Sequence, residues 1–98
     1  KDVSDVLVHG TTNLTTANAP AQITSVTVKP KKGIQLKAGI GNGGVVYIGN
    51  IGVGNTLANV LCGFPLEAGD ALFMPCEDPT ILYANNASAN DVIHWLIV

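Results

Sequence analysis

The stretch that decides the fold runs from residue 45 to residue 75 and reads VVYIGNIGVGNTLANVLCGFPLEAGDALFMP. It contains two short apolar runs, residues 45–48 and Ala71–Met74, each bounded by glycine or proline. Both runs are too short for helices and contain β-branched or aromatic residues, so they are predicted to be β-strands. Just before the second run, Glu67-Ala68-Gly69 is predicted to be a tight turn, because glycine adopts positive φ without steric cost.

Two segments before this stretch have the alternation of a half-buried strand, with apolar residues at every second position. They are residues 23–28, with Val26 and Val28 on one face, and residues 34–38, with three inward positions. A basic turn at residues 29–33 separates them. We therefore expect the two segments to pair as a hairpin with a solvated outer face.

Residues 81–84 and 92–98 are the last two predicted strands, and the polar residues 85–90 form the turn between them. The final strand is apolar on both faces. One face fits a domain core, so the other must meet a loop, another sheet or another chain. Residues 56–61 are the one candidate for a single helical turn.

The chain as a whole is predicted to be an all-β protein. About seven short strands, spaced by ~8 to 12 residues with turn chemistry between them and no substantial helix, are typical of an antiparallel β-sandwich. The length of 98 residues allows one domain, assigned to residues 17–98. The threonine-rich residues 1–16 are expected to form an extended N-terminal arm or, alternatively, a first edge strand.

The composition excludes some functions and indicates assembly. Hydrophobic residues make up 47% of the chain and charged residues 12%, against about 25% charged residues in an average soluble domain. Such a neutral surface predicts that the molecule is covered by partners. The absence of arginine argues against binding to nucleic acid. The chain has no run of ~18 apolar residues, so no membrane span is predicted, and no signal-peptide pattern is visible.

Residues with catalytic potential are present but do not form a recognisable arrangement. The candidates for a nucleophile or a base are Ser4, Ser25, Ser88, Cys62, Cys76, His9 and His94. His94 lies in the final apolar strand, where a core or interface histidine is the favoured interpretation. Because nothing signals a nucleophile with its base and orienting acid, the protein is expected not to be an enzyme.

No metal or cofactor is expected either. The two cysteines and two histidines lack a zinc spacing, and a disulfide between Cys62 and Cys76 is disfavoured. Glu67 and Asp70, like the later acidic pair, supply too few oxygens for a calcium loop. The glycine-rich residues 39–54 contain no lysine, which a phosphate-binding loop would need.

Several motifs, in this order, carry a resemblance to a known family: HGTT at residues 9–12, GIQLKA at 33–38, VYIGNIGV at 46–53, GFPLEAGD at 63–70, the acidic pair at 77–78 with Leu82-Tyr83 after it, and the closing strand at 92–98. Together they resemble small β-sandwich virion proteins of tailed bacteriophages. Such proteins serve as capsid decoration (cement) proteins or as modules of head or tail fibres. The segment 54–62 is longer and more apolar than the usual link in this family.

The resemblance implies an antiparallel sandwich or jelly roll that forms a homo-oligomer, often a trimer, on the outer surface of a capsid assembled in the cytoplasm of a bacterial host. The implied partner is the major capsid protein, and the implied function is to stabilise contacts between capsid subunits. No catalytic residues come with the family. The alternative is a glycan- or receptor-binding module of a fibre, which predicts an exposed aromatic ring at Tyr47 or Trp95, although core packing is the favoured role of the aromatic residues.

The residues expected to contact the capsid or a neighbouring subunit belong to three groups. The first comprises the apolar residues of the arm, which have no evident place in the sandwich. The second comprises the lysines of the basic turn, which could face an acidic neighbour, and the third is the tryptophan of the final strand. These residues are Val3, Val6, Leu7 and Val8, then Lys29, Lys31 and Lys32, and then Trp95.

Overall fold

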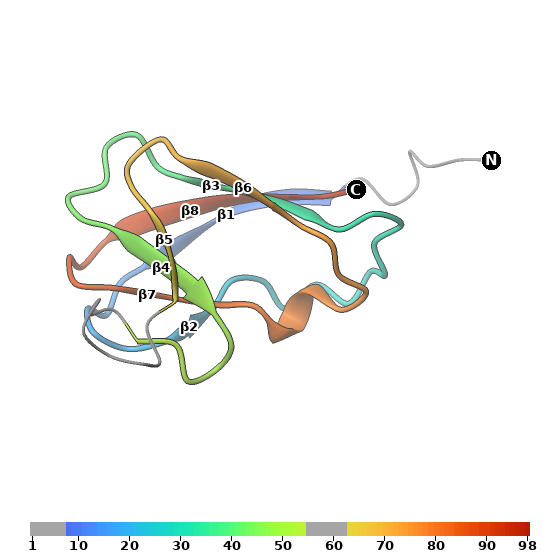
Figure 1. Ribbon diagram of the computed structural model, residues 1–98, viewed down its shortest axis with the longest axis horizontal. Helices are drawn as coiled ribbons and strands as arrows, with labels where there is room; N and C mark the ends of the chain where they lie inside the picture. The colour runs from blue at the N-terminus through green and yellow to red at the C-terminus, as the bar shows by residue number, and fades with distance from the viewer. Residues whose placement is uncertain (1–7, 55–62) are drawn as a thin grey trace.

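Two four-stranded antiparallel sheets pack face to face (Figure 1). The computed structural model describes residues 8–54 and 63–98. The first sheet has the order β1-β8-β3-β6, formed by Val8–Leu14, Asp91–Ile97, Ile34–Ala38 and Ala71–Met74. The second sheet has the order β2-β7-β4-β5, formed by Ala21–Gln22, Tyr83–Asn86, Val46–Gly49 and Phe64–Leu66. The prediction of an all-β antiparallel sandwich is therefore confirmed.

The order of the strands is that of a jelly roll. The chain crosses from one sheet to the other at every connection except the one between β4 and β5. Eight strands in two such sheets are the jelly-roll arrangement found in viral capsid and lectin domains. In the described part of the chain, the one helical segment is a 3-10 turn at Pro79–Ile81, which Asp78 caps by accepting a hydrogen bond from the backbone N–H of Thr80.

The core lies between the sheets and follows from the period of two in the strands. Ile34, Leu36 and Ala38 of β3 are fully buried, as the alternation predicted. Ile93 and Ile97 of β8 lie on the same face, because the register places them opposite residues of β3. The second sheet adds Val46, Ile48, Leu66 and Ala84 to this cluster.

The strand predicted at residues 23–28 is wrong, and so is its pairing with residues 34–38. The segment has no ladder of its own, and β3 lies instead between β8 and β6. Two isolated hydrogen bonds hold Ile23 in place. Its N–H donates to the carbonyl of Leu82, and its carbonyl accepts from the hydroxyl of Thr12. The Thr24 hydroxyl accepts from the N–H of Val26 and competes with a regular ladder.

Two further boundaries differ from the prediction. The three residues of β5 form a strand that the apparent turn sequence around Pro65 concealed. β7 begins two residues later than predicted, because the capped 3-10 turn occupies the residues before it. Asn85 and Asn86 consequently lie in a strand and are buried, whereas they were predicted to lie in a polar turn.

The N-terminal segment joins the sandwich from Val8 onward. β1 pairs with β8 from Val8 opposite Ile97 to Leu14 opposite Asp91, so this part of the expected arm is an edge strand, the second of the two alternatives. A domain that began at residue 17 would leave this strand out of its sheet. Residues 1–7 of the expected arm, the helical turn proposed at residues 56–61, and Cys62 lie outside the described residues.

Candidate interaction surfaces

The outer face of the β1-β8-β3-β6 sheet is left uncovered by the described part of the chain, and we call it the open face. Its members alternate with the inward residues of the four strands. They are His9, Thr11, Asn13, Gln35, Lys37, Ala71, Phe73, Val92, His94 and Leu96. Seven of the ten are exposed and three are half-buried. Lysine and histidine are its only titratable side chains, so the face carries no carboxylate.

The other sheet is different, because the loop after β4 folds over its outer face. The amide of Asn85 donates to the carbonyl of Val53 at 2.9 Å, and Val53 itself is 3% exposed. Tyr47, on that outer face, retains 8% of its exposure. The two faces of the sandwich are therefore not equivalent, and the open face is the one left for a partner.

His94 lies at the centre of the open face rather than in the core. Its Nδ1 atom shares a hydrogen bond of 2.8 Å with the hydroxyl of Thr11 on the neighbouring strand. In the described residues, no hydrogen bond links a histidine to a serine or cysteine, and no group of three or more His, Cys, Asp or Glu side chains could hold a metal ion. The sequence predicted that a loop, another sheet or another chain covers the second face of the final strand. No segment of the described chain covers it.

Trp95, the contact residue expected on the final strand, makes its contacts within the fold. Its ring lies over Gly10, because a Cβ added to Gly10 would lie only 2.9 Å from Cε2 of the ring. The ring Nε1 donates to the hydroxyl of Thr12 at 3.2 Å. Tyr47 is also buried, so neither aromatic ring proposed for sugar binding is an exposed platform. The exposed aromatic rings are those of Phe64 and Phe73, at 56% and 41%.

The basic turn is exposed as expected. The ammonium of Lys29 lies 3.9 Å from a carboxylate oxygen of Glu77, and both side chains are largely solvated, so this pair contributes about 0 to 1 kcal/mol. Lys31 and Lys32 are exposed, and the N–H of Lys32 donates to the carbonyl of Val98. These lysines are therefore available to a partner beside the C-terminal end of β8.

Of the four apolar residues of the arm, Val8 is the one that the structure describes. Val8 is half-buried and packs against the core cluster, so it does have a place in the sandwich. The idea that it lacked one was wrong because the segment is an edge strand from this residue on. Val3, Val6 and Leu7 lie outside the described residues.

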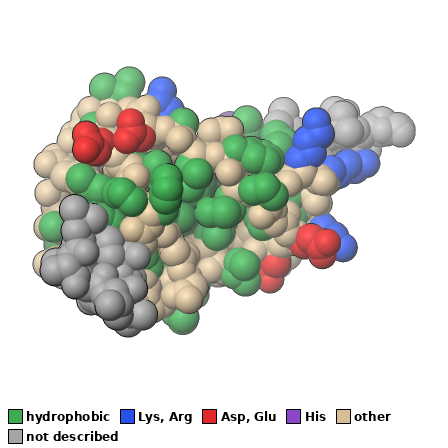
Figure 2. All heavy atoms as spheres, in the orientation of Figure 1, with side chains coloured by type: hydrophobic (Ala, Val, Ile, Leu, Met, Phe, Trp, Pro, Cys, Tyr) green, Lys and Arg blue, Asp and Glu red, His purple; other side chains and the backbone are tan. Residues whose placement is uncertain are grey.

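A second surface that the described residues leave uncovered is the side of the sandwich on which β5 and β6 form the two sheet edges. We call it the β5/β6 side. Figure 2 views the molecule from this side and shows hydrophobic side chains gathered across its middle, with acidic side chains toward both ends and most of the visible lysines toward one of them. Exposed Phe64 and Phe73 and half-buried Leu72 and Met74 come from these two strands. The sequence predicted β6 correctly but gave no indication that it is an edge strand.

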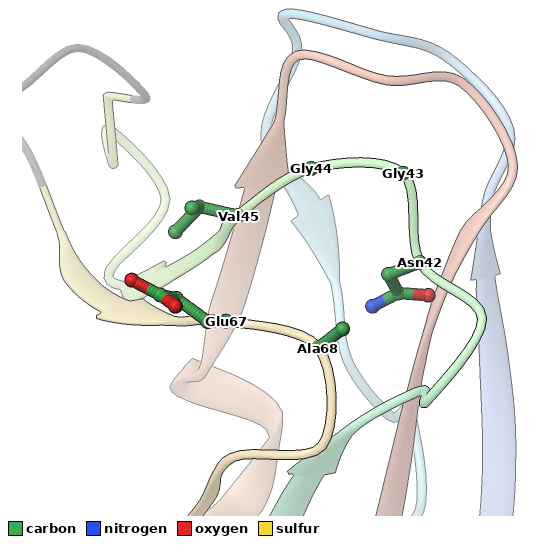
Figure 3. A pocket seen from close by; sticks show the side chains of 6 residues that line it. All are labelled: Asn42, Gly43, Gly44, Val45, Glu67 and Ala68. Carbon is green, nitrogen blue, oxygen red and sulfur yellow. The ribbon is translucent and has the colours of Figure 1, made fainter.

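A shallow hollow of about 210 Å³ lies between the β3–β4 loop and the turn before β6. In Figure 3, Asn42 and Ala68 face each other across it and the Glu67 carboxylate lies apart, beside Val45. Both polar atoms of the Asn42 amide are engaged, because the amide donates to the carbonyl of Val92 and accepts from the N–H of the same residue. The hollow thus offers a ligand one charged group and few free polar atoms.

Buried polar groups hold the loop that forms this hollow. Asp91 is 3% exposed, and one of its oxygens accepts from the N–H of Gly43 at 2.8 Å. Together with Asn42 it fixes the glycine-rich loop to β8, so the glycines serve the fold here. The Asp70 carboxylate closes the next turn by accepting from the N–H of Glu67 at 3.0 Å, with Gly69 at φ 86°, as the predicted turn required. Glu67 and Asp70 therefore belong to one turn, which the Asp70 carboxylate closes.

Cys76 has a free thiol and is half-buried. Burial, followed by the negative charge of Asp78, raises the pKa of this thiol, which makes it a weak nucleophile at neutral pH.

No helix among the described residues has the length and apolar character needed to cross a membrane. The jelly roll is a fold that many functions share, so the architecture does not by itself choose among them. Comparison of the chain with models of protein families, with curated protein sequences and with solved structures finds no match.

Proposed function

We propose that the protein is a structural protein of a virion, a decoration protein that binds the outside of an assembled bacteriophage head and stabilises contacts between subunits of the major capsid protein. The observation that carries the proposal is the open face, a broad sheet surface that has no carboxylate and is not covered by the described chain. Charged residues are depleted at the centres of protein interfaces, so such a face suits contact with another protein.

The mechanism is the burial of surface at several points of a lattice. Each apolar contact contributes about 25 cal/mol per Å² removed from water. Val3, Val6 and Leu7, which precede β1 in the chain, are proposed to add apolar contacts, and the exposed Lys29, Lys31 and Lys32 to meet acidic groups of the shell. An oligomer of any symmetry, the trimer that the resemblance implies included, would engage several subunits at once, so an assembled head would be bound far more tightly than a free subunit.

The fold supports this proposal by analogy only, since jelly rolls occur in viral capsid proteins and in lectins. The alternative, a glycan- or receptor-binding module of a head or tail fibre, requires an exposed aromatic platform. Tyr47 is buried and the Trp95 ring is engaged with Gly10 and Thr12, so the two expected positions do not favour it.

The test is co-sedimentation of the full chain with heads assembled from the major capsid protein of the same genome, beside the unassembled capsid protein. We expect saturable binding to heads only. Gln35→Glu adds a carboxylate to the open face without changing its shape, and Gln22→Glu is the matched control on the other sheet. Burying an unpaired charge costs more than about 1.4 kcal/mol, so Gln35→Glu should weaken binding about tenfold or more.

Binding to free subunits as strong as to heads, or equal effects of the two glutamates, would contradict the proposal. A glycan array probed with the same chain covers the alternative. Saturable binding to a sugar that Phe73→Ala or Phe64→Ala abolishes, with no binding to heads, would favour the receptor-binding module.

A further inference from the structure

The backbone of β6 is unpaired along one side. β6 is the last strand of its sheet and pairs with β3 only. The N–H of Ala38 donates to the carbonyl of Asp70 at 2.9 Å, and hydrogen-bonded positions alternate along an antiparallel ladder. Ala71 and Phe73 therefore direct their N–H and C=O groups away from β3. In the described part of the chain these four groups have no hydrogen-bond partner.

Two of the other three sheet edges have features that oppose pairing, and the third, β1, is seven residues long with polar side chains at its exposed positions, His9, Thr11 and Asn13. Edge strands are usually protected by proline, lysine or shortness. β5 contains Pro65, and β2 is two residues long. β6 reads Ala-Leu-Phe-Met, with Phe73 41% exposed and Leu72 and Met74 half-buried beside the core. An exposed, uncharged, apolar edge is a template for pairing with another strand.

We propose that a second copy of this chain occupies the β6 edge, so that two β6 strands pair antiparallel about a two-fold axis. With the axis at Leu72, Ala71 of each copy lies opposite Phe73 of the other. Each N–H then meets a C=O, and the two N–H groups of each copy give four hydrogen bonds in all. The two four-stranded sheets become one sheet of eight strands, and the apolar side chains of both β5/β6 sides are brought together.

The charges at the two ends of β6 fit this partner. Glu67 and Asp70 come just before the strand, whereas Lys31 and Lys32 lie at its other end, since Gly33 packs directly on the backbone of Met74. Lys37, opposite Ala71, leaves the first end with one more acidic than basic side chain, and Lys29, Glu77 and Asp78 leave the other end with one more basic than acidic side chain. Antiparallel pairing therefore brings together two ends of opposite net charge.

Of the three lysines at this end of β6, Lys29 is the one with an ion pair among the described residues. Glu77 also lies there, but it is next to Lys29, so Lys31 and Lys32 form no ion pair within the described residues. Both are therefore free to meet the acidic end of a second copy.

The contact does not rest on the proposed function, and its test needs no capsid. Sedimentation velocity and native mass spectrometry of the full chain, over a range of concentrations, should give a monomer–dimer equilibrium that weakens in high salt. Phe73→Pro removes an outward N–H that the fold does not use, at the kind of edge position where proline is tolerated. It should weaken dimerisation at least tenfold and leave the β-sheet circular dichroism intact.

Phe73→Lys, which keeps the N–H but adds a charge at the edge, should have the same effect and serves if the proline variant does not fold. Ile51→Lys, at a side chain that is 69% exposed on the β4–β5 loop, is the control and should dimerise normally. Glu67→Lys and Lys32→Glu should each weaken the dimer, and the double variant should restore it. A monomer at every concentration, a trimer, a dimer that Phe73→Lys leaves intact, or charge reversals without mutual rescue would overturn the proposal.

Discussion

Gly33 is the position where a single methyl group should damage this fold most clearly. Its φ is 155°, a conformation that L side chains rarely adopt. A Cβ there would lie 2.8 Å from the Cα of Pro75 and closer still to the carbonyl oxygen of Met74. Both atoms belong to the backbone, so they cannot turn aside as a side chain could. Gly33→Ala must therefore shift the end of β6 relative to β3.

The expected loss has two parts. A non-glycine residue in a sparsely populated backbone region costs about 1 to 3 kcal/mol. Overpacking that forces a backbone shift costs about 1 to 3 kcal/mol more. The free energy of unfolding should fall by about 2 to 6 kcal/mol, out of roughly 5 to 15 kcal/mol for a domain of this size. At about 4 to 8 °C per kcal/mol, the melting temperature should drop by at least ~8 °C.

Two other glycines separate the contributions. Gly69 has φ 86° but no atom within 4 Å of a Cβ, so Gly69→Ala should show the conformational cost alone. Gly41 also has nothing within 4 Å of a Cβ and no positive φ, so Gly41→Ala should be neutral or slightly stabilising.

The assay is urea unfolding followed by circular dichroism and by the fluorescence of Trp95, the one tryptophan of the chain. From the most to the least stable variant, the expected order is Gly41→Ala, then Gly69→Ala, then Gly33→Ala. If Gly33→Ala proved as stable as Gly69→Ala, the close contact between β3 and β6 would be refuted.

Three further outcomes follow from the described contacts. The raised pKa of the Cys76 thiol should make its alkylation at pH 8 slower than that of a solvated cysteine, as measured by peptide mass spectrometry. Asp78→Asn should speed the alkylation up, and equal rates in the variant and the original chain would contradict the role of Asp78. The pKa of Asp78 is held below its usual 3.8 by hydrogen bonds from the side chain and backbone of Thr80, so this cap is present at neutral pH and is lost only as pH falls through that lowered pKa. NMR titration should find the midpoint of Asp78 nearer 3.8 in Thr80→Ala, and no change would refute the cap. Thr12→Val removes a hydroxyl that both donates to a buried carbonyl and accepts from the Trp95 ring, so it should cost about 1 to 3 kcal/mol and shift the tryptophan emission, whereas the exposed Thr27→Val should do neither.

Local patterns account for the parts of the fold that the sequence predicted. The alternation of Ile34, Leu36 and Ala38 predicted a strand with that face in the core, and all three residues are buried there. Gly69 predicted a turn because the tolerance of positive φ is a property of glycine itself, and its φ is indeed positive. Residues 23–28 show the limit of this reasoning, because alternation also describes an extended segment that has no neighbouring strand.

What a strand pairs with is a non-local matter, and tertiary structure alone decided it. The apolar run Ala71–Met74 indicated a strand from its composition, but its place at a sheet edge depends on β3 finding β8 as its other neighbour. Likewise, the last strand was known to have two apolar faces, and only the assembled sheet put His94 on an open face and left Trp95 over Gly10. The sequence determined most of the extended segments and the inward residues of β3, because those follow from steric limits and side-chain alternation, whereas β5 and the start of β7 were not recognised. The surfaces left for partners emerged from the order of the strands, which is set by packing between residues far apart in the chain.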